Sequence, residues 1–157
     1  MNPQLQFLLE KIDQGYRKKA WHGPNLRGSL RGVSAVEAAW KPSPRRHSIW
    51  EIAIHCAYWK YAVGRRISGD KRGSFPRQGS NWFSPIDLSD GAWKKDLALL
   101  ETMHARMKQA IARLKDSDLN RRAANSGQKN ADLIWGIAAH DIYHAGQIQL
   151  LKKLRGE

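Results

Sequence analysis

Apolar residues recur at helical spacing through most of this chain, and the alternation typical of strands is almost absent. The clearest case begins at Ser48 and Glu51, which match a capping box, S-x-x-E, directly ahead of an apolar run. The apolar stripe of that run continues to Ile67, and Gly69 follows as a helix stop. This pattern predicts a long helix over residues 48–69 and favours an all-α fold.

Three further stretches carry the same periodicity. A first helix is expected from Pro3 with Asn2 as its N-cap, a third over about residues 89–115, and a fourth from Asn130, which can cap it. Short helical turns are expected at residues 26–31 and 34–40. A polar, glycine-rich connection over residues 70–85 separates the second and third long helices. We therefore expect a four-helix bundle with a long connection between helices 2 and 3.

Length and composition indicate one domain over residues 1–157 in a reducing compartment. The 157 residues suffice for a self-supporting core, and 41% of them are apolar. There is no apolar run of the roughly 18 residues that a membrane span needs. The first residues do not resemble a secretory signal, and the single cysteine, Cys56, cannot form an internal disulfide. We expect a cytoplasmic protein without a membrane partner.

The chain is strongly basic, with 27 Lys and Arg against 14 Asp and Glu and a formal net charge of +13. Such a surplus attracts polyanions, among them nucleic acid. The basic residues are scattered in doublets, however, and no zinc finger or RNA-binding loop accompanies them. Any contact with nucleic acid is therefore expected to be non-specific, and an anionic substrate would benefit from the same field.

His140 and His144 lie four residues apart in the fourth predicted helix. Side chains at this spacing share one helix face, and two imidazoles so placed can bind one divalent cation. His55 lies in the second predicted helix among apolar residues and can supply a third ligand. The alternative for each histidine is an ordinary buried imidazole held by a hydrogen bond.

Two segments with these histidines resemble the DinB/YfiT-like superfamily. Residues 133–148, LIWGIAAHDIYHAGQI, are similar to its C-terminal signature, and residues 47–55, HSIWEIAIH, resemble its second-helix motif. The Trp21–Pro24 corner is also similar, so the resemblance spans nearly the whole chain. It implies a four-helix bundle, commonly a homodimer, with zinc, nickel or another first-row ion held by His55, His140 and His144. Imidazole ligands alone do not choose among these metals.

Three neutral imidazoles would leave a coordination position open, as in catalytic sites. An open position accepts water and lowers its pKa, or accepts a thiol and holds it as thiolate. The resemblance implies either a thiol S-transferase that uses a low-molecular-weight thiol or a metal-dependent hydrolase, in both cases with a small-molecule substrate. The alternative is a non-catalytic module in which the metal joins two helices and the basic surface meets nucleic acid or another polyanion.

Five neighbouring residues are candidates for further roles. Glu51 could act as a general base or hold a ligand, although its capping role is the favoured explanation. His104 could be a fourth ligand or touch the substrate. Gln147 could line the pocket or make an interhelical hydrogen bond. Tyr143 is expected to pack against another helix rather than to offer its hydroxyl, and Trp82 could close the pocket from its loop.

The remaining candidates are expected to stay outside the metal site. Asp141 and Cys56 follow the predicted ligands directly and so point about 100° away from them on the helix. Cys56 is expected to be a buried apolar residue. His22 and His47 lie in connecting segments and are expected to be exposed or to cap helices. The seven tryptophans are expected mainly to fill the core.

Overall fold

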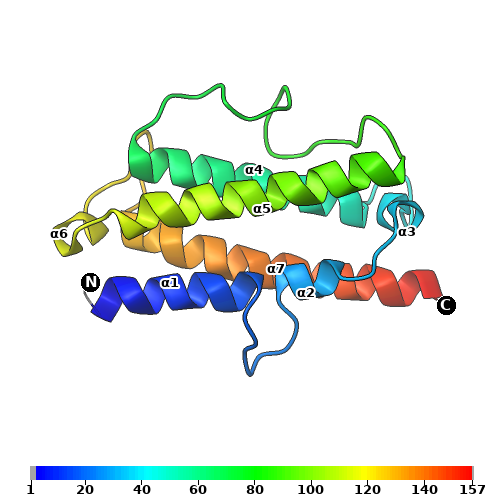
Figure 1. The fold of residues 1–157 in the computed structure, drawn as a ribbon, viewed down its shortest axis with the longest axis horizontal. Coiled ribbons are helices and arrows are strands. Elements are labelled where there is room, and N and C mark those ends of the chain that lie inside the picture. The colour runs from blue at the N-terminus through cyan, green and yellow to red at the C-terminus, as the bar shows by residue number, and fades with distance from the viewer. Residues whose placement is uncertain (1–2, 157) are drawn as a thin grey trace.

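The computed structural model describes residues 3–156, which form seven α-helices and no strand (Figure 1). The helices are α1 (Pro3–Tyr16), α2 (Leu26–Leu30), α3 (Ala35–Ala39), α4 (Ile49–Ser68), α5 (Asp90–Ala112), α6 (Asp116–Leu119) and α7 (Asn130–Gly156). Within this range no helix is long and apolar enough to cross a membrane.

The long helices are arranged in two pairs, α4 with α5 and α1 with α7, and α4 also packs on α7 between the pairs (Figure 1). This confirms the predicted helical class, but the described residues hold seven helices where four long ones were predicted. Two of the additional helices, α2 and α3, coincide with the predicted helical turns. The third, α6, lies in a stretch that was predicted only as polar, where the Asp118 carboxylate accepts a hydrogen bond from the Lys115 backbone N–H at 2.8 Å.

Helix α4 begins and ends where the sequence indicates. The Ser48 hydroxyl accepts from the Glu51 backbone N–H at 3.1 Å, and the Glu51 carboxylate accepts from the Ser48 backbone N–H at 3.0 Å. Gly69 ends the helix with φ of 81°, a left-handed conformation that glycine adopts without steric cost. The α4–α5 contact is close, because a Cβ added at Gly64 would lie 3.2 Å from the Met107 Cα.

The two predicted asparagine caps have different outcomes. Asn130 lies within α7, and its side-chain amide donates to the Asp118 carbonyl at 2.9 Å. It therefore ties α7 to α6, which corrects the predicted capping role. Asn2 lies outside the described residues.

The tryptophans divide between the core and the surface. Trp50 and Trp93 are buried and lie against each other. Trp21, in the turn before α2, is 98% exposed, and Trp135, on the outer side of α7, is 62% exposed. The expectation that tryptophans mainly fill the core is wrong for these two residues.

The segment over residues 69–89 contains no helix and runs back along α4 (Figure 1). Phe75 and Phe83 pack with Tyr58 of α4, with ring centroids 5.4 Å from the Tyr58 ring in both cases. This aromatic contact holds the segment on the body of the protein and brings residues 81–84 to the middle of α4. The segment thereby supplies one side of the histidine site.

Candidate metal centre

Three histidines from two helices converge on one point. The His140 Nε2 lies 3.1 Å from the His55 Nε2 and 3.2 Å from the His144 Nε2. His55 comes from α4, and the other two come from successive turns of α7, as their spacing predicts. His55 and His144 are buried, whereas His140 is partly exposed. The three imidazoles could together hold one metal ion.

In two of the rings, a hydrogen bond at Nδ1 determines that Nε2, the nitrogen that faces the other histidines, carries a lone pair. The His55 Nδ1 lies 2.8 Å from the Asn81 carbonyl oxygen, which can only accept, so Nδ1 carries the proton. The His144 Nδ1 donates in the same way to the Gln147 Oε1 at 2.7 Å. Both Nε2 atoms are therefore unprotonated and available as ligands.

A divalent cation fits this donor set better than hydrogen bonding does. A proton on the His140 Nε2 could satisfy only one of the two lone pairs that face it, and the buried His140 Nδ1 has no hydrogen-bond partner among the described residues. In a tetrahedral zinc site with Zn–N bonds of about 2.05 Å, ligand nitrogens lie roughly 3.3 Å apart. The observed separations of 3.1 and 3.2 Å are close to that value.

The surroundings keep the imidazoles neutral, which metal binding requires. Burial lowers the pKa of His55 to about 4, and repulsion from a charged His144 acts in the same direction. Burial followed by repulsion from His144 and His55 lowers the pKa of His140 to about 3. Burial also lowers the pKa of His144, against the opposing effect of its hydrogen bond to Gln147.

The 69–89 segment covers the His55 side of the cluster. The Trp82 ring stacks on the His55 ring with centroids 3.9 Å apart, and His47 stacks on Trp82 at 3.5 Å. Asn81, with φ of 71°, accepts from the Trp59 indole N–H at 2.9 Å through its side chain. The prediction placed Trp82 at the site but missed Asn81, whose backbone carbonyl leaves no signature in the sequence.

Glu51 is held by other groups. Its carboxylate caps α4, forms an ion pair with Lys41 at 2.7 Å and lies 3.3 Å from the His47 Nδ1. Burial acts to raise the pKa of Glu51, but the bonds from Lys41 and the Ser48 backbone outweigh it and the pKa is lowered. Among the described residues, none of its hydrogen bonds or ion pairs reaches the three histidines. The contacts accord with the capping role favoured for this residue.

The other three candidates lie in different surroundings. His104 is buried and stacks on Tyr16 with centroids 3.8 Å apart, outside the three-histidine cluster. Tyr143 touches the His144 ring edge-on at 5.0 Å but is 64% exposed, so the predicted packing against another helix is wrong. The hydrogen bond of Gln147 is to His144 of its own helix, where an interhelical bond or a pocket wall was expected.

A second group of candidate ligands, Cys56, His140 and Asp141, lies on the inner side of the cluster. Cys56 is fully buried, and burial raises the pKa of its thiol well above the usual value. The Asp141 carboxylate is bound by the buried Lys60 ammonium. A protonated thiol and a paired carboxylate make this group a poorer metal site than the three imidazoles, in keeping with the prediction that neither residue is a ligand.

Replacing Gln147 with leucine is expected to weaken metal binding by roughly 10–100-fold, the usual effect of removing a group that orients a ligand imidazole. Leucine has a similar volume but cannot accept the His144 Nδ1 proton. The dissociation constant measured by competition with a chelator checks this. The Gln149→Leu variant, one half-turn along α7, is the control and should bind metal as the wild type does.

The metal-free protein is expected to lose stability as the pH falls from 7 to 5. Burial, followed by repulsion from Lys60, lowers the pKa of His104 to about 2, although its Nε2 lies 3.8 Å from the Asp13 carboxylate. That distance is too long for a hydrogen bond, and Lys108 already binds Asp13 at 2.7 Å. The unfolded chain thus takes up a proton near pH 6.5 that the folded chain does not, so stability is full above that pH and falls below it.

The His104→Met variant should reduce this pH dependence. The variant takes up one proton fewer on unfolding, which lowers the slope of the unfolding free energy against pH by up to about 1.4 kcal/mol per pH unit. Urea unfolding at pH 7, 6 and 5 in the presence of a chelator measures the slope. Parallel curves for the variant and the wild type would show that His104 is protonated in the folded state.

A comparison with models of protein families identifies the family of this chain. A family model described as the DinB superfamily matches residues 20–148, well over half of the chain, and this range includes all three histidines. No curated protein and no solved structure matches the chain. The chain belongs to the DinB superfamily.

Proposed function

We propose that this protein is a metal-dependent enzyme that acts on a small molecule at the His55, His140 and His144 site. The observation that carries the proposal is the convergence of three Nε2 atoms. In His55 and His144, a hydrogen bond at Nδ1 leaves the Nε2 atom with a free lone pair. Three neutral ligands leave the metal's charge uncompensated and leave room for a further ligand. A site built only to hold helices together would be expected to close its coordination shell with a fourth protein ligand.

The reaction is either thiol transfer or hydrolysis. A divalent cation in this site would supply a Lewis acid that lowers the pKa of a thiol or of water. The Trp82 ring, stacked on His55, forms an aromatic wall beside the site. His140 is partly exposed, so the site is accessible from that side. The exposed Tyr143 ring lies beside His144. Aromatic side chains next to the site suit a low-molecular-weight thiol or an organic substrate.

Elemental analysis of the purified protein, followed by reconstitution with Co²⁺, tests the proposal. We expect about one metal per chain and a visible cobalt spectrum. If the enzyme transfers thiols, a small thiol such as β-mercaptoethanol should change that spectrum through new sulfur-to-metal charge transfer. Failure to bind metal at near-stoichiometric level after reconstitution would contradict the proposal, whatever the substrate.

The alternative function is a metal-stapled binding module. A cation held by His55 and the α7 histidines would join α4 to α7, and the net charge of +13 favours binding of polyanions. This function predicts that the protein binds duplex DNA and that the affinity collapses by about 200 mM salt, as expected for unspecific phosphate contacts. It also predicts that removal of metal unfolds the bundle.

We further propose that the protein is a homodimer through the outer face of α7. Exposed apolar residues lie along one side of that helix: Trp135, Ile142, Tyr143, Leu150 and Leu154. Exposed apolar surface of this extent marks interaction sites. Light scattering should give twice the chain mass, and Leu150→Glu should give the monomer, whereas Val36→Glu, at an exposed site on α3, should not. A monomeric wild type would refute this assignment.

A further inference from the structure

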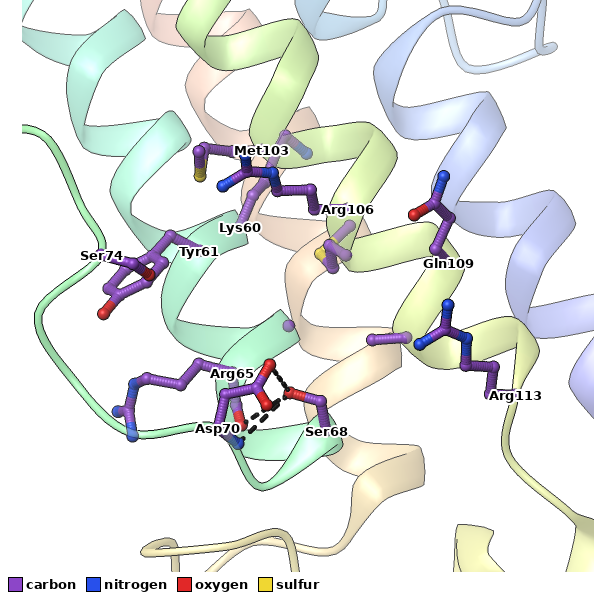
Figure 2. A pocket seen from close by; sticks show the side chains of 13 residues that line it. Lys60, Tyr61, Arg65, Ser68, Asp70, Ser74, Met103, Arg106, Gln109 and Arg113 are labelled. Carbon is purple, nitrogen blue, oxygen red and sulfur yellow. Dashed lines mark hydrogen bonds between the residues drawn. The ribbon is translucent and has the colours of Figure 1, made fainter.

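A hollow of about 230 Å³ lies between α4 and α5, beneath the start of the 69–89 segment (Figure 2). Its walls come from residues 60–68 of α4 and 103–110 of α5, together with Asp70, Ser74 and Arg113. The close approach of Gly64 to Met107 forms part of its floor. The metal ligand on α4, His55, does not line the hollow. This is a second concave site, separate from the histidine cluster.

Three arginines surround the hollow. Figure 2 shows Arg65 running from α4 towards the segment that follows it, on the side away from α5, while Arg106 projects from α5 and Arg113 from the residue after it. Within the part of the chain that the structure describes, none of the three has a carboxylate within the 4.0 Å of an ion pair. The one acidic residue of the lining, Asp70, accepts from the Ser68 hydroxyl at 2.6 Å. The lining therefore carries a surplus of positive charge.

Arg65 is the informative member of this set. The residue is only 6% exposed, and its buried Nε has no hydrogen-bond partner among the described residues. Lys60, five residues earlier on α4 and also buried, has its charge paired with Asp141. Among the described residues, the Nε is the one Arg65 nitrogen that is buried without a partner, and no carboxylate lies at ion-pair distance, so a bound anion would supply the missing counter-charge. Arg65 thus has the property expected of a residue that binds an anion.

We propose that this hollow binds the phosphate group of a small phosphate ester. Guanidinium groups present paired N–H donors that match phosphate oxygens, and Tyr61 and Ser74 add hydroxyl groups to the lining. At about 230 Å³ the hollow is smaller than typical sites for drug-sized ligands, which begin near roughly 300 Å³. Its size and concave shape suit a compact phosphate ester better than the extended backbone of a nucleic acid.

Calorimetric titration with inorganic phosphate at constant ionic strength tests this proposal. The double variant Arg106→Gln/Arg113→Gln removes two exposed cations from the lining without disturbing the buried Arg65. We expect its phosphate dissociation constant to rise at least tenfold. The control Arg45→Gln/Arg46→Gln removes the same charge outside the hollow and should change the constant less than twofold. Absence of saturable phosphate binding by the wild type, or equal losses in the two variants, would overturn the proposal.

Two further measurements separate the hollow from other phosphate sites. The His140→Ala variant should bind phosphate as the wild type does, and loss of binding there would assign the phosphate to the histidine site and overturn the proposal. A 12-base-pair DNA duplex should bind the α5 double variant and the control variant equally. A duplex that is displaced by phosphate and lost only in the α5 variant would identify the hollow as a nucleic-acid contact instead.

Discussion

Replacing His140 with alanine is expected to abolish metal binding at micromolar metal and to remove any turnover. His140 is the central ligand, since its Nε2 lies next to the Nε2 atoms of both His55 and His144. The affinity should fall by more than the roughly 10–100-fold that follows loss of an orienting group alone. Chelator competition and elemental analysis measure the loss. The His22→Ala variant is a control for removal of a histidine outside the cluster.

The same variant separates the enzyme from the metal-stapled module. In the enzyme, the bundle is held by its apolar core, so metal-free wild type and metal-free His140→Ala should both remain folded and melt within a few degrees of each other. In a stapled module, the metal-free wild type should already be unfolded or should melt far below the metal-loaded form. Any metal at 1,000 times its dissociation constant adds about 4 kcal/mol, so the comparison must be made without metal.

The sequence predicts the local parts of the site well. The capping box at Ser48 and Glu51 starts α4 at the correct residue, and the spacing of His140 and His144 places both on one face of α7. These predictions succeed because capping and helical spacing depend on residues within one turn of each other. The approach of His55 to His140 joins residues 85 positions apart. The predicted bundle made His55 a possible third ligand, and the resemblance to a family favoured it over an ordinary buried histidine.

Longer-range features of the site have no local signature. The Asn81 carbonyl that orients His55 depends on the path of the 69–89 segment, which the polar composition of that segment does not determine. The pattern indicates much of the buried side of α7, such as Ile137, His144 and Ile148. The limits of that side are harder to predict, because apolar residues occur around most of the circumference of the helix. Trp135 and Tyr143 are consequently exposed where packing was expected.

The buried ion pair between Lys60 and Asp141 joins α4 to α7 immediately beside the metal site. The side chains are 0% and 1% exposed, and Asp141 follows the ligand His140 in the chain. The Lys60 ammonium also lies 4.8 Å from the centre of the Tyr16 ring, and Asp141 is the carboxylate that pairs with it among the described residues. A charge in such a place depends on its partner, and removal of that partner leaves it buried without compensation.

The Asp141→Asn variant is therefore expected to lose about 3–5 kcal/mol of unfolding free energy, measured by urea denaturation at pH 7. The double variant Lys60→Met/Asp141→Leu removes both charges and should recover most of that loss, because apolar residues of similar size can replace a buried pair at little or no cost. Arg121→Met breaks the exposed pair with Asp118 and should cost less than about 1 kcal/mol.

The stabilities and metal affinities of these variants together show whether the Lys60–Asp141 pair serves only stability or also positions the metal ligand. If Asp141→Asn destabilises the protein and the double variant restores it, the loss comes from the stranded Lys60 charge. If the double variant is stable but binds metal more weakly than the wild type, the pair also holds the His140 turn of α7 in place for the ligand. A loss below about 1 kcal/mol for Asp141→Asn would show that Lys60 is solvated or uncharged in the variant, because a buried ammonium ion would otherwise be left without compensation.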